Sequence, residues 1–273
     1  MLLYRIYYLR LYKSGGSVGL EDTLRVYKYV YLSVSPICKM DARLKHPFTC
    51  IVAGPTMSGK TEWAKKLLRG RHTYVDTPIG DVIWCYGQWQ SGYNALRPYV
   101  RFVEGLVDTE DLHPSQPHLV IIDDLMDSGD KRIENFFTKV CHHMNTSCLY
   151  IVQNLFNQAK GHRTCSINSQ YMVVFKNPRE CQQIAHLSRQ MYPGESKVMT
   201  EAFRDATQEP YSYLFIDMKP TTHDALRLRS RVLDECQVVY VPKKYKKVLQ
   251  NAAPITFGGG EGVNIDNYGI PSR

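Results

Sequence analysis

Eight consecutive residues form a pattern that is typical of phosphate binding. They match G-x-x-x-x-G-K-[ST] and consist of Gly54, Pro55, Thr56, Met57, Ser58, Gly59, Lys60 and Thr61. The glycines let backbone N–H groups turn inward around a polyphosphate, Lys60 can reach the β and γ phosphates, and the Thr61 hydroxyl can bind Mg²⁺. An apolar run over 48–53 precedes the pattern and a helix-like segment over 62–68 follows it. The pattern in this setting predicts binding of a nucleoside triphosphate. A glycine turn beside a buried lysine is the alternative.

A second apolar run ends in two adjacent carboxylates. Residues 117–122 are followed by Asp123 and Asp124, as in a Walker B strand that is buried on both faces. Asp123 can hold Mg²⁺ directly or through water, and Asp124 is placed to polarise the attacking water as a general base. The alternative for Asp124 is a helix cap or turn residue. The carboxylate pair predicts an enzyme that hydrolyses ATP.

The next apolar run, 148–152, ends in two amides, Gln153 and Asn154. Ligands of open α/β sheets bind at the carboxyl ends of the strands, so Gln153 is placed to contact the γ phosphate or to orient the water. Asn154 is expected to cap the turn. An extra strand with a polar tip after the Walker B strand is typical of the additional-strand P-loop ATPases, a group that includes ring motors.

Ring ATPases need an arginine that reaches the γ phosphate of a neighbouring subunit, because the charge that develops in phosphoryl transfer must be neutralised. We expect Arg163 in this role, since it lies between the strand that ends at Gln153 and the apolar run 171–175. Arg132 and Arg179 compete with it. Each of the three also fits an ordinary surface charge.

Length and composition favour a soluble globular protein with one nucleotide-binding domain. The chain has 273 residues, of which 44% are hydrophobic, and no apolar stretch approaches the ~20 residues that span a bilayer. We therefore expect no membrane partner. The formal net charge is +8; residues 1–39 hold six Lys and Arg against two Asp and Glu, so they supply +4 and the rest of the chain +4. This balance favours a polyanionic partner such as nucleic acid, although a solvated basic surface is the plain alternative.

The eight cysteines form no C-x-x-C pair, and several stand inside apolar runs, which favours a reducing compartment. Cys141, His142 and His143, followed by Cys148, have the residue types of a zinc site. Adjacent histidines on a helix point about 100° apart, however. The favoured interpretation is a core cysteine beside two exposed histidines.

Strands and helices alternate from Met40 onward, which predicts an α/β fold with a mostly parallel sheet and helices on both faces. The expected strands are 48–53, 81–86, 100–103, 118–123, 148–153, 171–176 and 211–217, and the expected helices lie near 130–145 and 179–191. Residues 1–39 alternate Tyr and Val with Lys, which favours strands and does not fit a secretory signal. We expect an ATPase domain over 40–247, an appendage or start-site artefact over 1–39, and a disordered tail over 248–273.

Together these motifs resemble the viral DNA-packaging ATPases of the FtsK–HerA superfamily, specifically the poxvirus-type packaging ATPase found in Maverick/Polinton elements and related animal viruses. The resemblance covers about 40–247 and rests on the segments 54–61, 83–90, 119–126, 152–156, 168–179 and 213–220. It implies a RecA-like additional-strand P-loop NTPase core that hydrolyses ATP with Mg²⁺. It also implies a homo-oligomeric ring at a capsid portal or vertex that drives double-stranded DNA into the particle.

The resemblance gives Gln153 the role of a sensor glutamine. This chain departs from the family pattern at Asp124, where many relatives carry glutamate. The shorter side chain of aspartate shifts the position of the attacking water. The resemblance implies an intracellular, non-secreted protein at the host nucleus or viral assembly site, including the virion. The residues expected to contact DNA are Lys160, His162, Arg163, Lys176, Arg179 and the cluster 243–247. Such contacts to phosphates are sequence-independent and sensitive to salt. The cluster fits a nuclear localisation signal or a solvated end equally well.

Three other classes stay open. A P-loop nucleotide or nucleoside kinase needs an arginine-rich lid, but Arg227, Arg229 and Arg231 alternate in a strand-like run. A structural assembly protein would bind ATP only to order an interface. A hexameric helicase is a further kind of ring motor, whereas a helicase with two RecA-like domains needs a longer chain after Met40.

Overall fold

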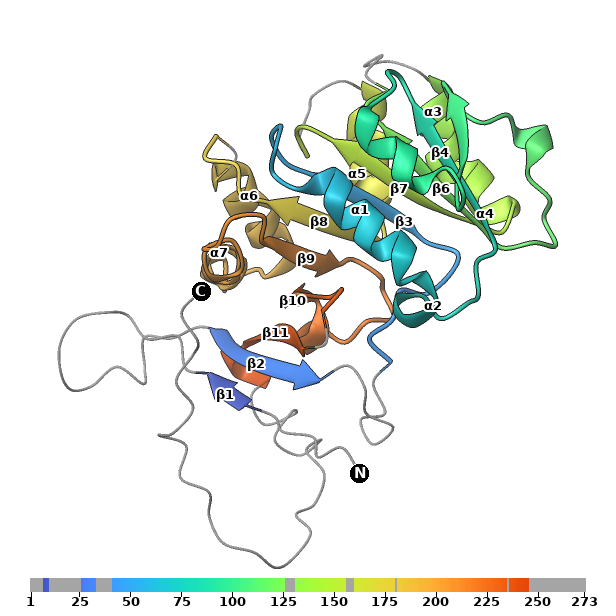
Figure 1. Ribbon diagram of the computed structural model, residues 1–273. Helices are drawn as coiled ribbons and strands as arrows, with labels where there is room; N and C mark the ends of the chain where they lie inside the picture. Colours follow the sequence, from blue (N-terminus) through green and yellow to red (C-terminus); the bar gives the residue numbers. More distant parts are fainter. Residues whose placement is uncertain are drawn as a thin grey trace, which may run out of the picture.

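The apolar runs of the sequence pair side by side in one sheet (Figure 1). The computed structural model describes residues 7–9, 26–32, 41–125, 131–155, 160–179, 181–234 and 236–245. Within these ranges the sheet has eleven strands in the order β1-β2-β11-β10-β9-β8-β3-β7-β6-β4-β5.

Parallel strands form the half of the sheet that follows the phosphate pattern and the carboxylate pair. They are β3 (Thr49–Ala53), β4 (Asp81–Tyr86), β5 (Arg101–Glu104), β6 (His118–Asp123), β7 (Thr146–Val152) and β8 (Tyr171–Phe175). Every residue of β3, β6, β7 and β8 is buried, as parallel strands covered on both faces require. The strand β7 lies between β3 and β6. This insertion confirms the predicted additional-strand fold class.

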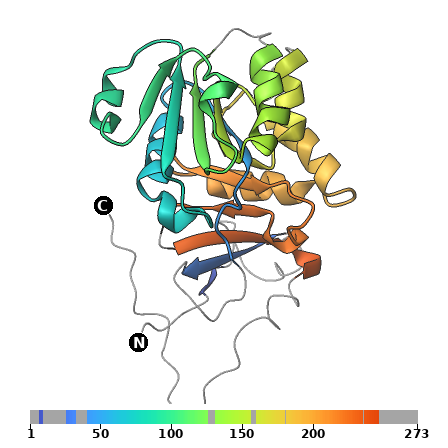
Figure 2. The same ribbon diagram turned by 90° about the vertical axis from the view of Figure 1, so that its right-hand side faces the viewer.

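Helices cover the two faces of this parallel half, as the 90° view shows (Figure 2). One face packs α1 (Lys60–Arg69), α2 (Arg71–Tyr74) and the 3-10 helix η2 (Ser91–Leu96). The other packs α3 (Lys131–Asn135), the π-helical turn η4 (Phe136–Val140), α4 (Cys141–His143), α5 (Lys160–Asn168), α6 (Cys181–Met191) and α7 (Lys197–Ala206). Alternate residues of each strand point to opposite faces. In β3, therefore, Cys50 and Val52 join the α1 layer, and Ile51 and Ala53 join the opposite layer.

Antiparallel strands extend the sheet beyond β8, and we call β9, β10 and β11 the wing. It consists of β9 (Tyr213–Asp217), β10 (Leu228–Ser230) and β11 (Cys236–Pro242). Single-turn 3-10 helices η3 (Thr109–Asp111), η5 (Asp224–Leu226) and η6 (Lys243–Tyr245) lie in the connections. Of the wing, only β9 was among the expected strands.

The expected strand structure of the first 39 residues is present as β1 (Tyr7–Leu9) and β2 (Val26–Leu32). The strand β2 pairs antiparallel with β11 along its whole length, from Leu32 opposite Cys236 to Val26 opposite Pro242. Residues 26–32 therefore share the sheet of the nucleotide-binding core. The domain start at Met40 stays a prediction, and the predicted tail over 248–273 lies outside the described residues.

Five cysteines of the described residues pack as small apolar residues. Cys50, Cys85, Cys141, Cys148 and Cys165 are free and buried, and the two histidines after Cys141 are exposed. The described part of the chain contains no group of three or more His, Cys, Asp or Glu placed to hold a metal ion. None of its helices is both long and apolar enough to cross a membrane.

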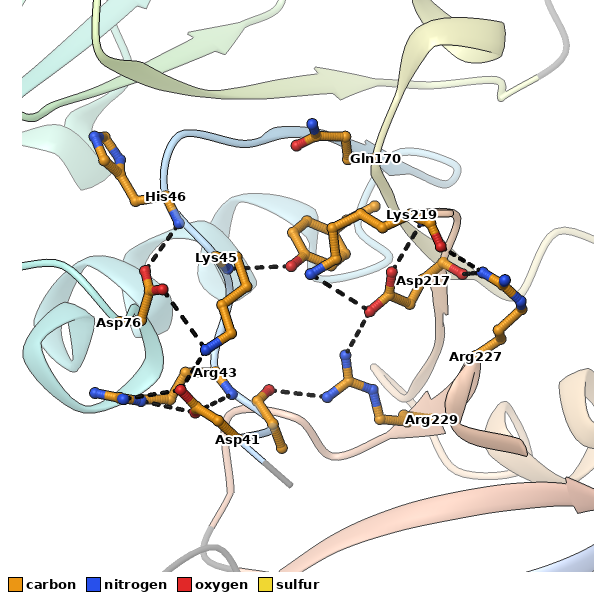
Figure 3. Close-up of polar contacts among 12 residues, drawn as sticks. Asp41, Arg43, Lys45, His46, Asp76, Gln170, Asp217, Lys219, Arg227 and Arg229 are labelled. Atoms are coloured by element: carbon orange, nitrogen blue, oxygen red, sulfur yellow. Dashed lines mark hydrogen bonds and ion pairs between the residues drawn. The ribbon is translucent and has the colours of Figure 1, made fainter. Parts of the chain in front are cut away.

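A network of charged side chains (Figure 3) lies at the amino end of β8, where Asp217 is paired with Tyr171. The buried Asp217 carboxylate accepts a hydrogen bond of 3.4 Å from Arg229 Nη2 and lies 3.9 Å from Lys219 Nζ. Arg229 Nη1 donates to the carbonyl of Ala42 at 2.9 Å. Arg227 Nη1 donates to the carbonyls of Asp217 and Lys219. Through the contact of Arg229 with Ala42, the network connects the segment that precedes β3 to the wing.

The variant R229M is expected to lower the free energy of unfolding by about 3 kcal/mol, because it leaves the Asp217 carboxylate buried beside Lys219 alone. The matched control is R101M, which removes the exposed ion pair of Arg101 with Asp111 and is expected to cost less than about 1 kcal/mol. Urea unfolding of both variants measures the difference. Equal losses would contradict the role given to the buried pair.

Candidate nucleotide-binding site

Three parallel strands bring the predicted site residues to one edge of the sheet. The phosphate loop follows β3, the carboxylate pair ends β6, and Gln153 follows β7. A pocket of about 200 Å³ opens at this edge. Its lining is Thr56, Met57, Lys60, Thr61, Gln90, Asp123, Asp124, Ile151, Val152 and Gln153. The structure therefore places Lys60, Thr61, Asp123, Asp124 and Gln153 around a single cavity.

Glycine shapes the loop at two positions. Gly59 precedes α1 with a left-handed φ of 102°, a conformation that residues with a Cβ rarely adopt. A Cβ on Gly54 would lie 2.7 Å from both Phe175 Cβ and Ser58 Oγ, so only glycine fits between the loop and β8. The backbone N–H of Gly54 donates to the carbonyl of Val152 at 3.3 Å. The loop is thus held against β7 and β8, with the positive end of the α1 dipole directed at it.

Lys60 lies over its own loop. Its Nζ donates to the carbonyls of Gly54 at 2.7 Å and of Pro55 at 2.8 Å. Burial lowers the pKa of Lys60, and the charges of Asp123 and Asp124 oppose that shift. The cavity thus has an ammonium on one wall and two carboxylates on another.

The two carboxylates stand in different surroundings. Asp123 is buried, and Asp124 is exposed with a left-handed φ of 55°. Burial is the main cause that raises the pKa of Asp123; the Tyr93 hydrogen bond and Lys60 lower it, and Asp124 raises it. The Asp123 carboxylate and the Thr61 hydroxyl supply the oxygen donors that Mg²⁺ prefers. A buried carboxylate beside a solvated one fits the separate roles predicted for them, Asp123 as metal ligand and Asp124 as base.

Tyr93 is a site residue that the sequence did not reveal. Its hydroxyl donates to Asp123 Oδ2 at 2.8 Å, and its buried ring packs against Trp84, at a centroid distance of 5.3 Å, and Phe102, at 5.4 Å. Burial, followed by the Asp123 charge, raises the pKa of Tyr93, so the phenol stays a donor. This contact fixes the orientation of the Asp123 carboxylate.

Gln90 is the second residue without a predicted role. It lies in the segment that follows β4, and β4 pairs with β6. The chain that leaves β4 therefore passes the end of β6, which brings Gln90 into the pocket. The segment 83–90 is a recognisable motif in the sequence. The motif does not show that Gln90 and Tyr93 lie near Asp123, because that depends on the pairing of β4 with β6.

The predicted arginine stands apart from this pocket. Arg163 is exposed in the first turn of α5 and does not line the cavity. Arg132 and Arg179 are exposed as well. A role of Arg163 in the site of a neighbouring subunit stays a prediction.

The residues expected to contact DNA have varied surroundings. Lys176 is exposed at the end of β8, whereas His162 is half-buried with its ring 5.5 Å from that of Tyr150. Lys243 and Lys244 are exposed. The side chain of Lys160 and the whole of Lys246 and Lys247 lie outside the described residues.

Comparison with known proteins gives matches among solved structures alone; no protein-family model and no curated protein matches the chain. The genome packaging NTPase B204 from Sulfolobus turreted icosahedral virus 2, in complex with sulfate, is 14% identical, with 66% of this chain and 95% of that chain covered and a TM-score of 0.44. The same protein in complex with ATP-gammaS is 14% identical, with 64% of this chain and 94% of that chain covered and a TM-score of 0.42. The cytoplasmic domain of the Thermomonospora curvata Type VII secretion ATPase EccC is 12% identical, with 71% of this chain and 25% of that chain covered and a TM-score of 0.43.

All three TM-scores are below 0.5, and the chain's own residues define its class. The strand order with β7 between β3 and β6, the phosphate loop after β3 and the carboxylates after β6 are together the arrangement of an additional-strand P-loop NTPase.

The variant Y93F is expected to raise the Mg²⁺ concentration needed for half-maximal nucleotide binding about tenfold, because the metal carboxylate loses the donor that orients it. It also removes a hydrogen bond that lowers the pKa of Asp123. Mg²⁺-dependent binding should then be lost at a higher pH than in the wild type as the solution is acidified. Titration of a fluorescent ATP analogue at several Mg²⁺ concentrations and pH values measures both effects.

The matched control is Y99F, which removes the hydroxyl of an exposed tyrosine from the same part of the chain and should change neither quantity. If Y93F and Y99F show the same Mg²⁺ requirement, Tyr93 does not orient the metal carboxylate.

Proposed function

We propose that the chain is an ATPase that uses Mg-ATP to move double-stranded DNA, as one subunit of a homo-oligomeric ring that packages a viral genome. The observation that carries the ATPase part is the meeting of Lys60, Thr61, Asp123 and Asp124 at one pocket. The packaging part rests on the resemblance of the motif segments to viral DNA-packaging ATPases. That resemblance implies a capsid or portal protein as the partner and the viral assembly site or host nucleus as the location.

Each residue has a separate task in this proposal. The loop N–H groups and the Lys60 ammonium hold the β and γ phosphates. Thr61 and Asp123 hold Mg²⁺, which neutralises charge on the phosphate oxygens when it is bound. Asp124, exposed at the pocket, accepts the proton of the attacking water, and Gln153 orients that water.

The position of two of the three arginines weighs against the kinase alternative. Arg227 and Arg229 lie at the opposite edge of the sheet from the phosphate loop, where Arg227 pairs with Asp224 and Arg229 with Asp217. They cannot close over a phosphate bound at Lys60. Of the three arginines, Arg231 alone lines a cavity together with Lys60, so an arginine-rich lid of the kind that a nucleotide kinase uses would need further residues.

Turnover of ATP with and without DNA tests the proposal against its alternatives. We expect hydrolysis that double-stranded DNA stimulates more than single-stranded DNA does, with a stimulation that falls steeply as salt is raised. A kinase would respond to a phosphoryl acceptor, and a structural protein would turn over no ATP. Hydrolysis that neither form of DNA stimulates would defeat the packaging proposal.

Two variants in the same assay separate binding from chemistry. D124N is expected to bind ATP like the wild type and to hydrolyse it 10²–10⁴-fold more slowly, the range for loss of a general base. K60A is expected to lose ATP binding as well. Normal hydrolysis by D124N would leave Asp124 as a turn residue.

Mixed rings test the role of Arg163. K60A and R163A are each expected to be inactive alone, because one lacks the phosphate lysine and the other the arginine offered to its neighbour. In mixtures, a site with Lys60 from an R163A subunit and Arg163 from an adjacent K60A subunit is complete, so activity should return. R179A mixed with K60A is the control. No recovery in the R163A mixture would mean that Arg163 does not act across a subunit interface.

A further inference from the structure

A second, larger cavity adjoins the phosphate loop on the side away from the carboxylates. Its volume is about 990 Å³. One wall is the loop and the first turns of α1, from Met57 to Lys66, and the other is the wing with the segments 205–213 and 230–234. Since the wing and β6 lie on opposite sides of β3 in the sheet, this cavity and the carboxylate pocket flank the loop.

The loop residues Lys60 and Thr61 line both cavities. A triphosphate held by the loop must direct its terminal phosphate toward Asp124 if it is to be hydrolysed. The other end of the molecule, which carries the sugar and the base, must then leave the loop on the opposite side. The larger cavity lies in that direction.

Tyr211 has an unusual position at this cavity. Its side chain is 71% exposed although it is large and aromatic, and its φ of 60° lies in the left-handed region. A short turn holds it there, since Ser212 donates to the carbonyl of Glu209 from its backbone N–H at 3.3 Å and from its hydroxyl at 2.6 Å. A non-glycine residue in this conformation is strained, and such strain is concentrated at binding sites.

The ring of Tyr211 stands directly beside the loop. A Cβ built on Gly59 would lie 3.4 Å from both Cβ and Cδ1 of Tyr211. Polar groups also line the cavity, among them Arg231 and an ion pair of Lys66 with Asp234. The cavity thus offers an aromatic face together with hydrogen-bonding groups, which is the combination that a nucleoside needs.

We propose that this cavity binds the nucleoside of the nucleotide, with the base stacked on the ring of Tyr211. The inference rests on the proposed function, because it takes the phosphates to be bound at Lys60. It gives the wing a role in substrate binding: the segments that flank its strands recognise the part of the nucleotide that the phosphate loop does not touch.

Calorimetric titration with Mg-ATP and with Mg-tripolyphosphate, which has the phosphates but no nucleoside, tests the proposal. The variant Y211A is expected to weaken ATP binding about tenfold through loss of base stacking and to leave tripolyphosphate binding within about twofold of the wild type. Y211F keeps the ring and should bind both ligands like the wild type. Y99A, which truncates another exposed tyrosine, is the matched control and should change neither affinity.

The two ligands distinguish a failure of this inference from a failure of the ATPase proposal. If Y211A binds ATP like the wild type, or loses ATP and tripolyphosphate equally, the nucleoside does not stack on Tyr211. If K60A binds both ligands like the wild type, the phosphates are not held at the loop and the proposed function itself is wrong. Thermal unfolding of Y211A, expected to match that of the wild type because the side chain is exposed, checks that its fold is kept.

Discussion

The parallel pairing of β3, β7 and β6 is the constraint on which the site depends. Parallel strands end at the same edge of a sheet, so the residues that follow them meet although they are far apart in the chain. Lys60, Asp123 and Gln153 share one pocket for this reason. The complete burial of these three strands fixes their register, because a shift of one residue would turn the apolar set away from its helices.

The two edges of the sheet carry charge in different ways. At the amino edge, Asp217 and Arg229 are buried and paired, and their contacts join the entry to β3 to the wing. At the carboxyl edge, Lys60 Nζ donates to two loop carbonyls, Asp124 is exposed, and neither is in an ion pair with another described residue, although both line one cavity. Charges that are satisfied internally stabilise a fold, whereas charges that converge on a cavity are available to a ligand. This contrast separates the structural cluster from the candidate site.

The sequence predicted the parallel half of the fold well and the remainder poorly. Its strands are continuous apolar runs bounded by turn residues, which is a strong local signal. The wing strand β10 lacks that signal, since it has three residues and one of them is the buried Arg229. Strand β11 contains the apolar run 238–241 and was nevertheless missed. Helix α7 was missed although Val198, Met199, Ala202 and Phe203 repeat at helical spacing. The helix expected near 130–145 is interrupted by a π-helical turn, which periodicity does not distinguish from an α-helix.

Local chemistry is what the sequence determined by itself: a glycine loop with Lys60, and a strand that ends in Asp123 and Asp124, are defined by residue types at fixed spacing. Tertiary structure decided which other residues join them. Tyr93 reaches Asp123 because β4 pairs with β6, and Tyr211 reaches the loop because the antiparallel wing returns along β8. Such contacts link residues that are distant in the chain, and they depend on strand order and side-chain packing, which no short motif encodes.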